Sequence, residues 1–293
     1  MRITELLKNK TGPTISFETL PPKTPKGWES IDNTLDELAL LNPDFITCTF
    51  GAGGKRRDGS LEMIQKIKHQ RNQEMVAHIS GFGLGPDEII SVMDNFKTAG
   101  IENILVIRGD VPEIEGFEPH PQSFNYATEM IDFIKPKYDF CIGAAAYPEG
   151  HIDANSLEKD MDYMQMKIDN GADYFICNYF YNNRYYFDFM ERCAARNIQV
   201  PILAGVMPIY SVKMLYLLAE ICGATVTDEI KEELAKIPAD DQNALNEFGI
   251  KFATEKCTEL IKSGVKGLHF YTMDRFISVK GILTELRKGG LLN

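Results

Sequence analysis

Polar side chains recur in this 293-residue chain where short apolar runs end. The first is Glu18, which follows the run "TISF" and precedes a double proline. Carboxyl, imidazole, guanidinium, amide and hydroxyl groups transfer protons and bind polar ligands, so these positions are candidates for function. The candidates are Glu18, Thr49, His78, Ser80, Arg108, Asp110, Tyr147, Glu149, Asn178 and Tyr271.

Each of these residues also has a structural explanation. Glu18 fits a solvated loop acid or the cap of a following helix. The "RGD" at residues 108–110 fits an ion pair across a loop, and His78 fits a core histidine with its hydrogen bonds satisfied. His151 and His269 are isolated, without a paired-histidine or His-x-Glu spacing, so we predict no metal site.

The elements that must position these residues alternate along the chain. Eight apolar or β-branched runs are each followed by a stretch of helical periodicity, the pattern of βα units and a parallel sheet. The runs are "TISFETL", "DFITCTF", "EMVAHIS", "NILVIRGD", "DFCIGAAAYP", "YFICNYF", "PILAGVMP" and "GLHFYTM", beginning near residues 14, 44, 74, 103, 139, 174, 201 and 267.

Eight βα units predict the α/β class and a (β/α)8 TIM barrel, with extra helices in the long interval 209–266 before the last strand. In such barrels chemistry lies at the C-terminal ends of the strands, whereas polar residues at the other end more often serve stability. Glu18 falls on the functional side.

Composition narrows the class of protein further. The chain has 31 basic and 42 acidic residues without a basic cluster, so we expect no nucleic-acid partner. No apolar run is long enough for a membrane span or a secretion signal. The six scattered cysteines are typical of small buried residues in a reducing cytosol, and we therefore predict a cytoplasmic protein.

Several short motifs occur in order along the chain at the ends of the predicted strands: "SFETLPPK", "TCTFGAGG", "AHISG", "IRGDVP", "AAYPEGH", "MKIDNGADYFICNYF" and "HFYTMDR". Together they resemble the methylenetetrahydrofolate reductases, flavoproteins that reduce a folate-bound one-carbon unit. The resemblance extends from residue 14 to residue 275 and implies one catalytic domain, residues 1–293, with flavin across the barrel mouth. Without a C-terminal extension, the chain is similar to the short microbial form.

The resemblance implies reversible reduction of 5,10-methylenetetrahydrofolate to 5-methyltetrahydrofolate. By resemblance Glu18 is the general acid that opens the folate ring to an iminium, which then accepts hydride from reduced flavin. Its pKa should be raised by the apolar neighbours Phe17 and Leu20 and by a mouth closed by substrate. Asp110 would lie near pterin and flavin, favouring the cationic iminium and tuning the flavin potential.

The resemblance also implies a set of cofactor contacts. FAD is the expected cofactor, with FMN as the alternative, and the absence of a Gly-x-Gly-x-x-Gly motif after the first strand argues against binding in Rossmann fashion. Positions that the family uses around the flavin are Thr49, His78, Arg108, Gly109, Asp110, Tyr126, Ala127, Tyr147, His151, Asp160 and Lys167.

Departures from the family pattern gather where folate and electron donor bind. Asn178 stands in place of a glutamine that contacts both, and Val212 stands in place of a stacking aromatic that Tyr210 would have to replace. Asp274 stands where asparagine is common. The implied substrate-binding residues are Glu18, Asp110, Asn178, Tyr271 and Arg275.

Several functions stay open at this point. The electron donor is either NAD(P)H or a partner redox subunit docked at the mouth, and the resemblance implies an oligomer. A non-catalytic folate- or flavin-binding interaction subunit is a further alternative, although such a subunit would not need Glu18 and Asp110. A different flavin barrel, such as a proline dehydrogenase, would leave "SFETLPP" to chance.

Overall fold

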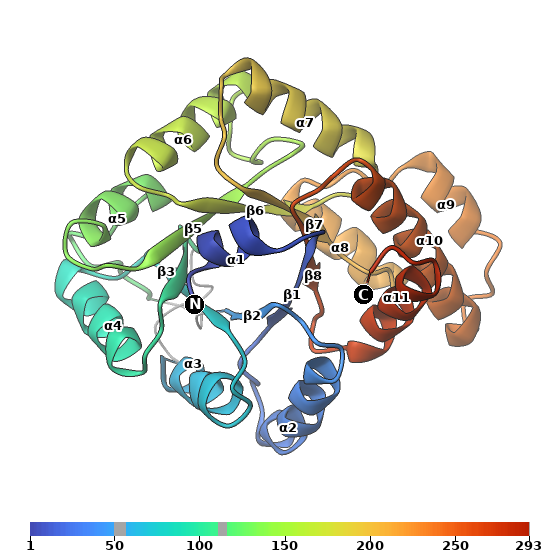
Figure 1. The fold of residues 1–293 in the computed structure, drawn as a ribbon, viewed down its shortest axis with the longest axis horizontal. Helices are drawn as coiled ribbons and strands as arrows, with labels where there is room; N and C mark the ends of the chain where they lie inside the picture. Colours follow the sequence, from blue (N-terminus) through green and yellow to red (C-terminus); the bar gives the residue numbers. More distant parts are fainter. Residues whose placement is uncertain (50–56, 111–115, 293) are drawn as a thin grey trace.

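Eight parallel strands form a closed barrel with helices around it (Figure 1). The computed structural model describes residues 1–49, 57–110 and 116–292. Each strand pairs with the next, and β8 closes on β1 with Glu18 opposite Tyr271, so the predicted TIM barrel is confirmed. The strands are β1 (Thr14–Thr19), β2 (Phe45–Cys48), β3 (Met75–Ser80), β4 (Asn103–Ile107), β5 (Cys141–Ala146), β6 (Tyr174–Tyr179), β7 (Ile202–Val206) and β8 (Gly267–Tyr271).

Each predicted run contains a strand, but several strands are shorter than their run. β4 ends at Ile107, so Arg108 and Asp110 lie in the loop that follows it. The cause is Gly109, whose φ of 82° belongs to the left-handed region that a strand does not use. Tyr147 similarly lies just beyond the end of β5. These residues are therefore presented by loops at the mouth and not by the strands themselves.

Helices surround the barrel and begin at recognisable caps. The Thr24 hydroxyl accepts from the Gly27 N–H at 3.1 Å, and Ser156 accepts from the Lys159 N–H at 3.2 Å. The helices are α1 (Ile3–Asn9), α2 (Pro25–Ala39), α3 (Arg57–Ile64) continuing as the π-helical η1 (Gln65–His69), α4 (Pro86–Thr98), α5 (Ala127–Ile134), α6 (Leu157–Asp169), α7 (Asn183–Ala195), α8 (Val212–Cys222), α9 (Asp228–Leu234), α10 (Gln242–Lys262) and α11 (Phe276–Lys288).

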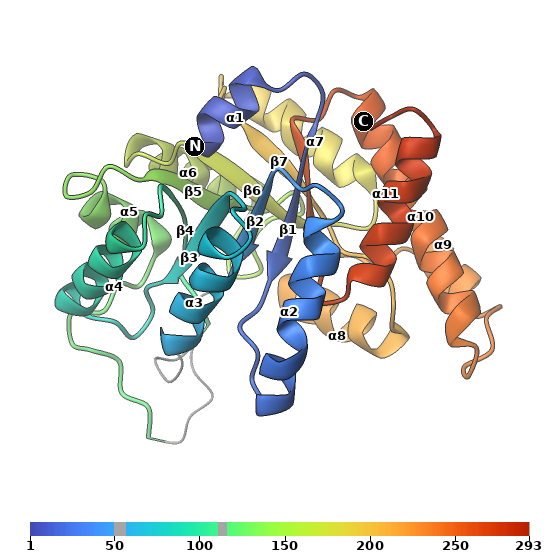
Figure 2. The same cartoon turned by 60° about the horizontal axis from the view of Figure 1, so that its bottom comes forward.

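The two ends of the barrel differ. Helix α1 covers the end where the strands begin, opposite the arrowheads in Figure 2. Its buried Ile3 and Leu7 pack against inward residues such as Phe45 and Leu105. This end is closed by apolar contacts, which leaves the C-terminal end of the strands as the open mouth.

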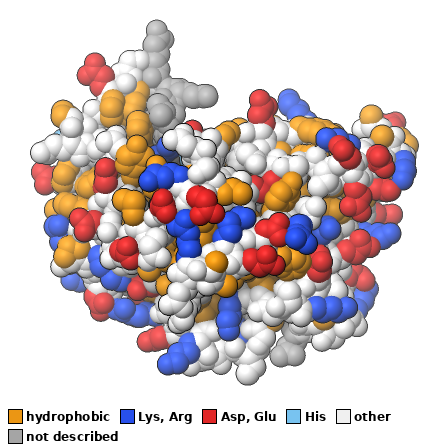
Figure 3. Space-filling model, turned by 90° about the horizontal axis from the view of Figure 1, so that it is seen from above, with side chains coloured by type: hydrophobic (Ala, Val, Ile, Leu, Met, Phe, Trp, Pro, Cys, Tyr) orange, Lys and Arg blue, Asp and Glu red, His pale blue; other side chains and the backbone are white. Residues whose placement is uncertain are grey.

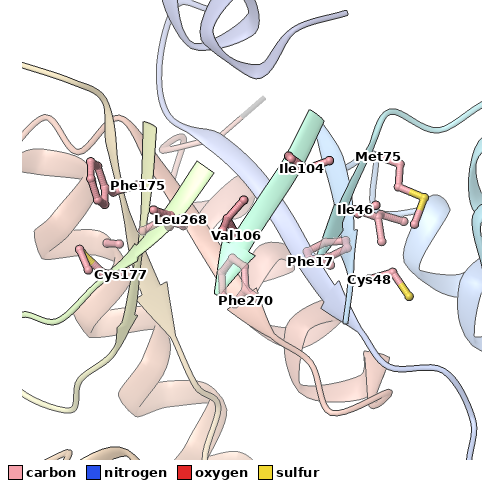
Figure 4. Close-up of a cluster of buried hydrophobic side chains, with 14 of the residues drawn as sticks. Phe17, Ile46, Cys48, Met75, Ile104, Val106, Phe175, Cys177, Leu268 and Phe270 are labelled. Atoms are coloured by element: carbon pink, nitrogen blue, oxygen red, sulfur yellow. The ribbon is translucent and has the colours of Figure 1, made fainter. Parts of the chain in front are cut away.

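The strands have two different faces because alternate side chains point to opposite sides. Outward residues such as Phe17, Ile46 and Phe270 form the main core between strands and helices (Figure 4). Complete burial of one such side chain stabilises the fold by about 1.5–3 kcal/mol. The inward face is more polar and includes Ser16, Glu18, Thr47, His78, Asn103, His269 and Tyr271.

The extra helices, the surface charge and the cysteines were also predicted from the sequence. Helices α8, α9 and α10 lie between β7 and β8, as predicted for this interval. In the face drawn in Figure 3, acidic and basic side chains are interspersed. All six cysteines are free, and all but the half-buried Cys222 are buried. Within the described residues, no helix is long and apolar enough to cross a membrane.

Candidate active site

Glu18 lies on the inward face of β1 near the mouth. Its side chain is 14% exposed, and its Oε2 lies 3.9 Å from Nε2 of His78 on β3. On the other side, Tyr271 of β8 donates its hydroxyl to the Cys177 carbonyl at 2.9 Å. The acid is thus enclosed by strands that are far apart in the sequence but adjacent or nearly so in the barrel.

The electrostatics around Glu18 favour its neutral form. Burial, and secondarily the negative charge of Asp274, raise the pKa of Glu18 to about 8. Burial also lowers the pKa of His78 to about 3, so the imidazole is neutral and does not stabilise a Glu18 carboxylate. The expected role of Phe17 is wrong, because Phe17 points outward into the main core while Glu18 points inward.

Unpartnered polar atoms line the inside of the barrel. Ser16 Oγ lies 2.8 Å from His269 Nδ1, but the other ring nitrogen of His269 has no hydrogen-bond partner among the described residues. The same holds for both ring nitrogens of His78, for Thr47 Oγ1 and for the Tyr174 hydroxyl. Since buried polar atoms are normally hydrogen-bonded, this interior is suited to a polar ligand or to water.

A second cluster, which we call the cationic cluster, consists of Arg108, Tyr147, His151, Asp160 and Lys167. Lys167 Nζ donates to the Ala145 carbonyl at 2.8 Å and lies 5.6 Å from the Tyr147 ring centroid. Burial lowers the pKa of Lys167 to about 8, against the opposing attraction of Asp160.

The remaining members of the cationic cluster are close to the same place. His151 packs edge-on against Tyr147 with ring centroids 4.6 Å apart, and burial together with Arg108 lowers the His151 pKa. Arg108 donates to Asp153 at 2.9 Å. The structure therefore brings together residues from the loops after β4 and β5 and from α6.

The other predicted cofactor positions lie in the loops after β2 and β4 and at the start of α5. At Gly109 an added Cβ would lie 1.7 Å from Ser80 Oγ, so only glycine fits. Thr49 follows β2 and donates its N–H to the Thr19 carbonyl at 3.1 Å. Tyr126 is 61% exposed and precedes Ala127 at the start of α5. Asp110 is exposed. The pKa of Tyr147 is raised mainly by burial, and the negative charge of Asp110 adds to this shift.

The residues near β6, β7 and β8 are bonded within the protein. Asn178 Nδ2 donates to the Cys222 carbonyl at the end of α8 at 3.2 Å. Tyr210 is only 7% exposed, with the Arg275 guanidinium 4.7 Å from its ring centroid. Val212, the first residue of α8, is 40% exposed. The amide and the aromatic ring at this edge of the mouth are therefore already engaged.

Three residues near Glu18 were not singled out for a role from the sequence. Ser16 shares the inward face with Glu18, and His269 shares it with Tyr271, so the two-residue period of a strand would have identified both. Asp274, noted only as a departure from the family, accepts the Leu20 N–H at 3.1 Å. No local pattern predicts that contact, because the residues are 254 positions apart.

Parts of two motifs, residues 50–54 of "TCTFGAGG" and residues 111–112 of "IRGDVP", lie outside the described residues. Within the described ranges, no group of three or more His, Cys, Asp or Glu side chains is placed to hold a metal ion.

Known proteins resemble this chain in sequence and in fold. Residues 2–287 match the family model described as methylenetetrahydrofolate reductase. The chain is 30% identical over 261 residues to the 5,10-methylenetetrahydrofolate reductase of Escherichia coli, covering 89% of this chain and 86% of that protein. It is 32% identical over 301 residues to methylenetetrahydrofolate reductase (NADH) 1 of Arabidopsis thaliana, covering 98% of this chain and 51% of that protein.

The chain thus spans about half the length of the plant relatives it matches. A solved structure of similar fold, an uncharacterized protein from Clostridium thermocellum that binds two copies of 5-methyl-5,6,7,8-tetrahydrofolic acid, has a TM-score of 0.64 at 15% identity, with 96% of both chains covered. The family match over nearly all residues, together with the two reductases, shows that this chain belongs to the methylenetetrahydrofolate reductase family.

Proposed function

We propose that this chain interconverts 5,10-methylenetetrahydrofolate and 5-methyltetrahydrofolate on a bound flavin. The observation that carries the proposal is the buried Glu18 carboxyl, which faces the barrel mouth with a pKa raised to about 8. In a chain of this family, an acid that keeps its proton near neutral pH meets the main chemical need of the reaction. The domain 1–293 would carry the whole reaction in one barrel.

Glu18 would act on the folate ring. The methylene bridge is a poor hydride acceptor until one bridging nitrogen takes a proton and the ring opens to a cationic iminium. The Glu18 carboxyl supplies this proton and becomes a carboxylate, and the new negative charge lies close to the cation that it has produced. Asp110 at the mouth adds a second negative charge toward the same cation. Neutral His78 lies near Glu18 without competing for its proton.

The cationic cluster fits the anionic end of FAD. Lys167 is half-buried, no carboxylate among the described residues hydrogen-bonds to it, and its ammonium is suited to phosphate oxygens. Arg108 now pairs with Asp153, but both side chains are partly exposed, so a phosphate can replace this weak ion pair. Gly109 lets the loop that carries Arg108 pack directly against Ser80, where a Cβ would lie 1.7 Å from the Ser80 hydroxyl. When bound, the reduced flavin supplies hydride to the iminium carbon.

The donor of electrons to the flavin is the second part of the proposal. Asn178 is bonded to the end of α8, Tyr210 is covered by Arg275, and Val212 offers no aromatic face. These contacts favour a partner redox subunit over direct use of NAD(P)H by the isolated chain. A non-catalytic binding subunit is the weaker alternative, because it has no need for a protonated buried acid.

The test is the visible spectrum of the purified protein, followed by anaerobic addition of 5-methyltetrahydrofolate. We expect a yellow protein with about one flavin per chain, whose flavin absorbance bleaches as the folate is oxidised. A colourless protein that also fails to take up FAD or FMN on reconstitution would rule out the proposed reaction. A yellow protein that methyltetrahydrofolate does not bleach would restrict the chain to flavin binding.

A further inference from the structure

The turn after β8 is bonded to β1 on both sides of Glu18. Thr272 Oγ1 donates to the Glu18 carbonyl at 2.6 Å, and the Leu20 N–H donates to Asp274 Oδ1 at 3.1 Å. Met273 and Asp274 both have left-handed backbone, with φ of 48° and 55°. Such angles cost energy in residues other than glycine, so the surrounding bonds must hold this turn in place.

Among the side chains that the structure describes, the groups around the Glu18 carboxyl provide no cation that would stabilise its ionised form. His78 of β3 is neutral, because burial lowers its pKa to about 3. Burial also raises the pKa values of Tyr271 on β8 and Cys48 on β2, so both are neutral as well. Among the described residues, Asp274 is the group whose negative charge adds to burial in raising the Glu18 pKa. Burial raises the pKa of Asp274 itself, and the hydrogen bond from the Leu20 N–H opposes this shift by favouring the Asp274 carboxylate. The adjacent Arg275 directs its guanidinium over the Tyr210 ring.

We propose that Asp274 is a positioning residue whose carboxylate, fixed by the Leu20 N–H, keeps the Glu18 carboxyl protonated until substrate arrives. Two neighbouring carboxylates resist being ionised together, so one proton is retained, and it resides on Glu18. After Glu18 has given this proton to the folate, both carboxylates face a cation and their repulsion is offset. The inference rests on the proposed function, in which Glu18 is the acid.

The experiment is a titration of Glu18 in the intact flavin-loaded protein with 13C-labelled glutamate side chains, followed by NMR. The Glu18 signal is assigned by its loss in Glu18→Gln. Asp274→Asn keeps the shape and one acceptor for the Leu20 N–H but removes the charge. We expect it to lower the Glu18 midpoint by about one pH unit or more. The pH above which folate reduction declines should fall by the same amount, because the acid must be protonated to act.

Asp44→Asn is the matched control. The Asp44 carboxylate accepts the Ile15 N–H at 2.6 Å, so it also bonds the backbone of β1, but at the closed end of the barrel. This variant should leave the Glu18 midpoint unchanged. An equal shift in both variants would show a general loosening of β1 and would overturn the assignment.

An unchanged Glu18 midpoint in folded Asp274→Asn also overturns the inference. Should that variant fail to fold, Asp274→Ser, which retains a hydroxyl acceptor for the Leu20 N–H, is titrated in its place under the same criterion. Failure of the proposed function has a different outcome: Glu18→Gln would then reduce methylenetetrahydrofolate at the normal rate, while the effect of Asp274 on the Glu18 midpoint would persist.

Discussion

Glu18 and Lys167 are two partly buried ionisable groups on opposite sides of the barrel mouth, and burial shifts their pKa values in opposite directions. Glu18 projects from β1, whereas Lys167 of α6 is bonded to Ala145 of β5, four strands away. Burial raises the pKa of Glu18 and lowers that of Lys167, and both reach about 8. At neutral pH each group is therefore mainly protonated, which makes Glu18 a neutral acid and Lys167 a cation.

The charges near Glu18 and near Lys167 explain why one group is neutral and the other is charged. Of the described residues near Glu18, His78 is neutral and Asp274 carries the charge that disfavours a Glu18 carboxylate. Lys167 has Asp160 within electrostatic reach, which favours its charge. Similar burial thus leaves a neutral acid on one side and a cation on the other, because the charge near Glu18 has the same sign as its ionised form and the charge near Lys167 has the opposite sign.

The largest expected effect comes from removing the proton on the acid side. Glu18→Gln retains size and hydrogen bonding but has no acidic proton, so methylenetetrahydrofolate reduction should fall by at least ~10²-fold. Flavin content should be unchanged, because the cationic cluster is intact. Steady-state turnover measures the effect, with Glu29→Gln on the exposed face of α2 as the control. Near-normal turnover would make Glu18 a structural residue.

The next largest effect concerns nicotinamide binding at the edge of the mouth formed by Asn178 and Val212, which lies between the Glu18 side and the Lys167 side. Without an aromatic side chain at Val212 to stack on the nicotinamide, the binding free energy loses roughly 0.5–1.5 kcal/mol. The Asn178 amide is bonded to the end of α8, and the loss of its hydrogen bond to the nicotinamide costs about 0.5–1.5 kcal/mol more. If additive, these losses weaken nicotinamide binding roughly ten- to a hundredfold. We therefore expect 5-methyltetrahydrofolate to reduce the isolated chain far more readily than NADH or NADPH.

Stopped-flow bleaching of the flavin measures this preference. Asn178→Gln combined with Val212→Phe should recover part of the loss, because it restores a longer amide and an aromatic face. Rapid reduction of the unmodified chain by micromolar NADH or NADPH would contradict the expectation and remove the argument for a partner subunit.

A smaller effect is expected from the cationic side. Lys167→Met keeps the length of the side chain but removes its charge, so flavin affinity should fall by about tenfold or more, the value of one charge-assisted hydrogen bond. Folate chemistry on the retained flavin should continue. The measurement is the amount of flavin that the variant retains on dialysis, compared with the unmodified protein. Circular dichroism shows whether the barrel is folded. Unchanged retention would exclude Lys167 from the cofactor site.

The smallest effect is on stability, and it has opposite pH dependence on the two sides. The folded-state pKa of Glu18 is above its ordinary value of 4.5, so its contribution to stability is lost as pH rises from 4.5 to about 8. Lys167 has the reverse relation: stability is lost as pH falls from 10.5 to about 8. Solvent in the open mouth limits each effect to about 1–2 kcal/mol.

Urea unfolding across pH tests this opposition. Glu18→Gln should gain stability over the unmodified protein as pH rises through this window, and it should show no gain in acid. Lys167→Met should be the more stable protein below about pH 8 and lose that advantage in strong base. If the unfolding free energies of the two variants changed with pH in the same direction, burial would not determine the charge states of Glu18 and Lys167.

Much of the fold was predictable from the sequence. Eight short apolar or β-branched runs such as "TISFETL", each followed by a stretch of helical periodicity, were enough to predict a (β/α)8 barrel. Placing Glu18, His78 and Tyr271 at one mouth followed directly, since parallel strands in a barrel end on the same side. The ends of the strands were less accurate, because Gly109 changes the backbone at a position that the apolar pattern does not mark.

The sequence by itself therefore determined which residues face the barrel interior and which end of the barrel they occupy, because strand periodicity is a local property. Only the tertiary structure decided the charge state of Glu18, which depends on burial and on Asp274, a residue 256 positions away by number that reaches β1 through the Leu20 N–H. It also decided that the Asn178 amide bonds the end of α8. Such contacts follow from closure of the barrel, which brings distant segments within hydrogen-bond distance without leaving a pattern in either segment.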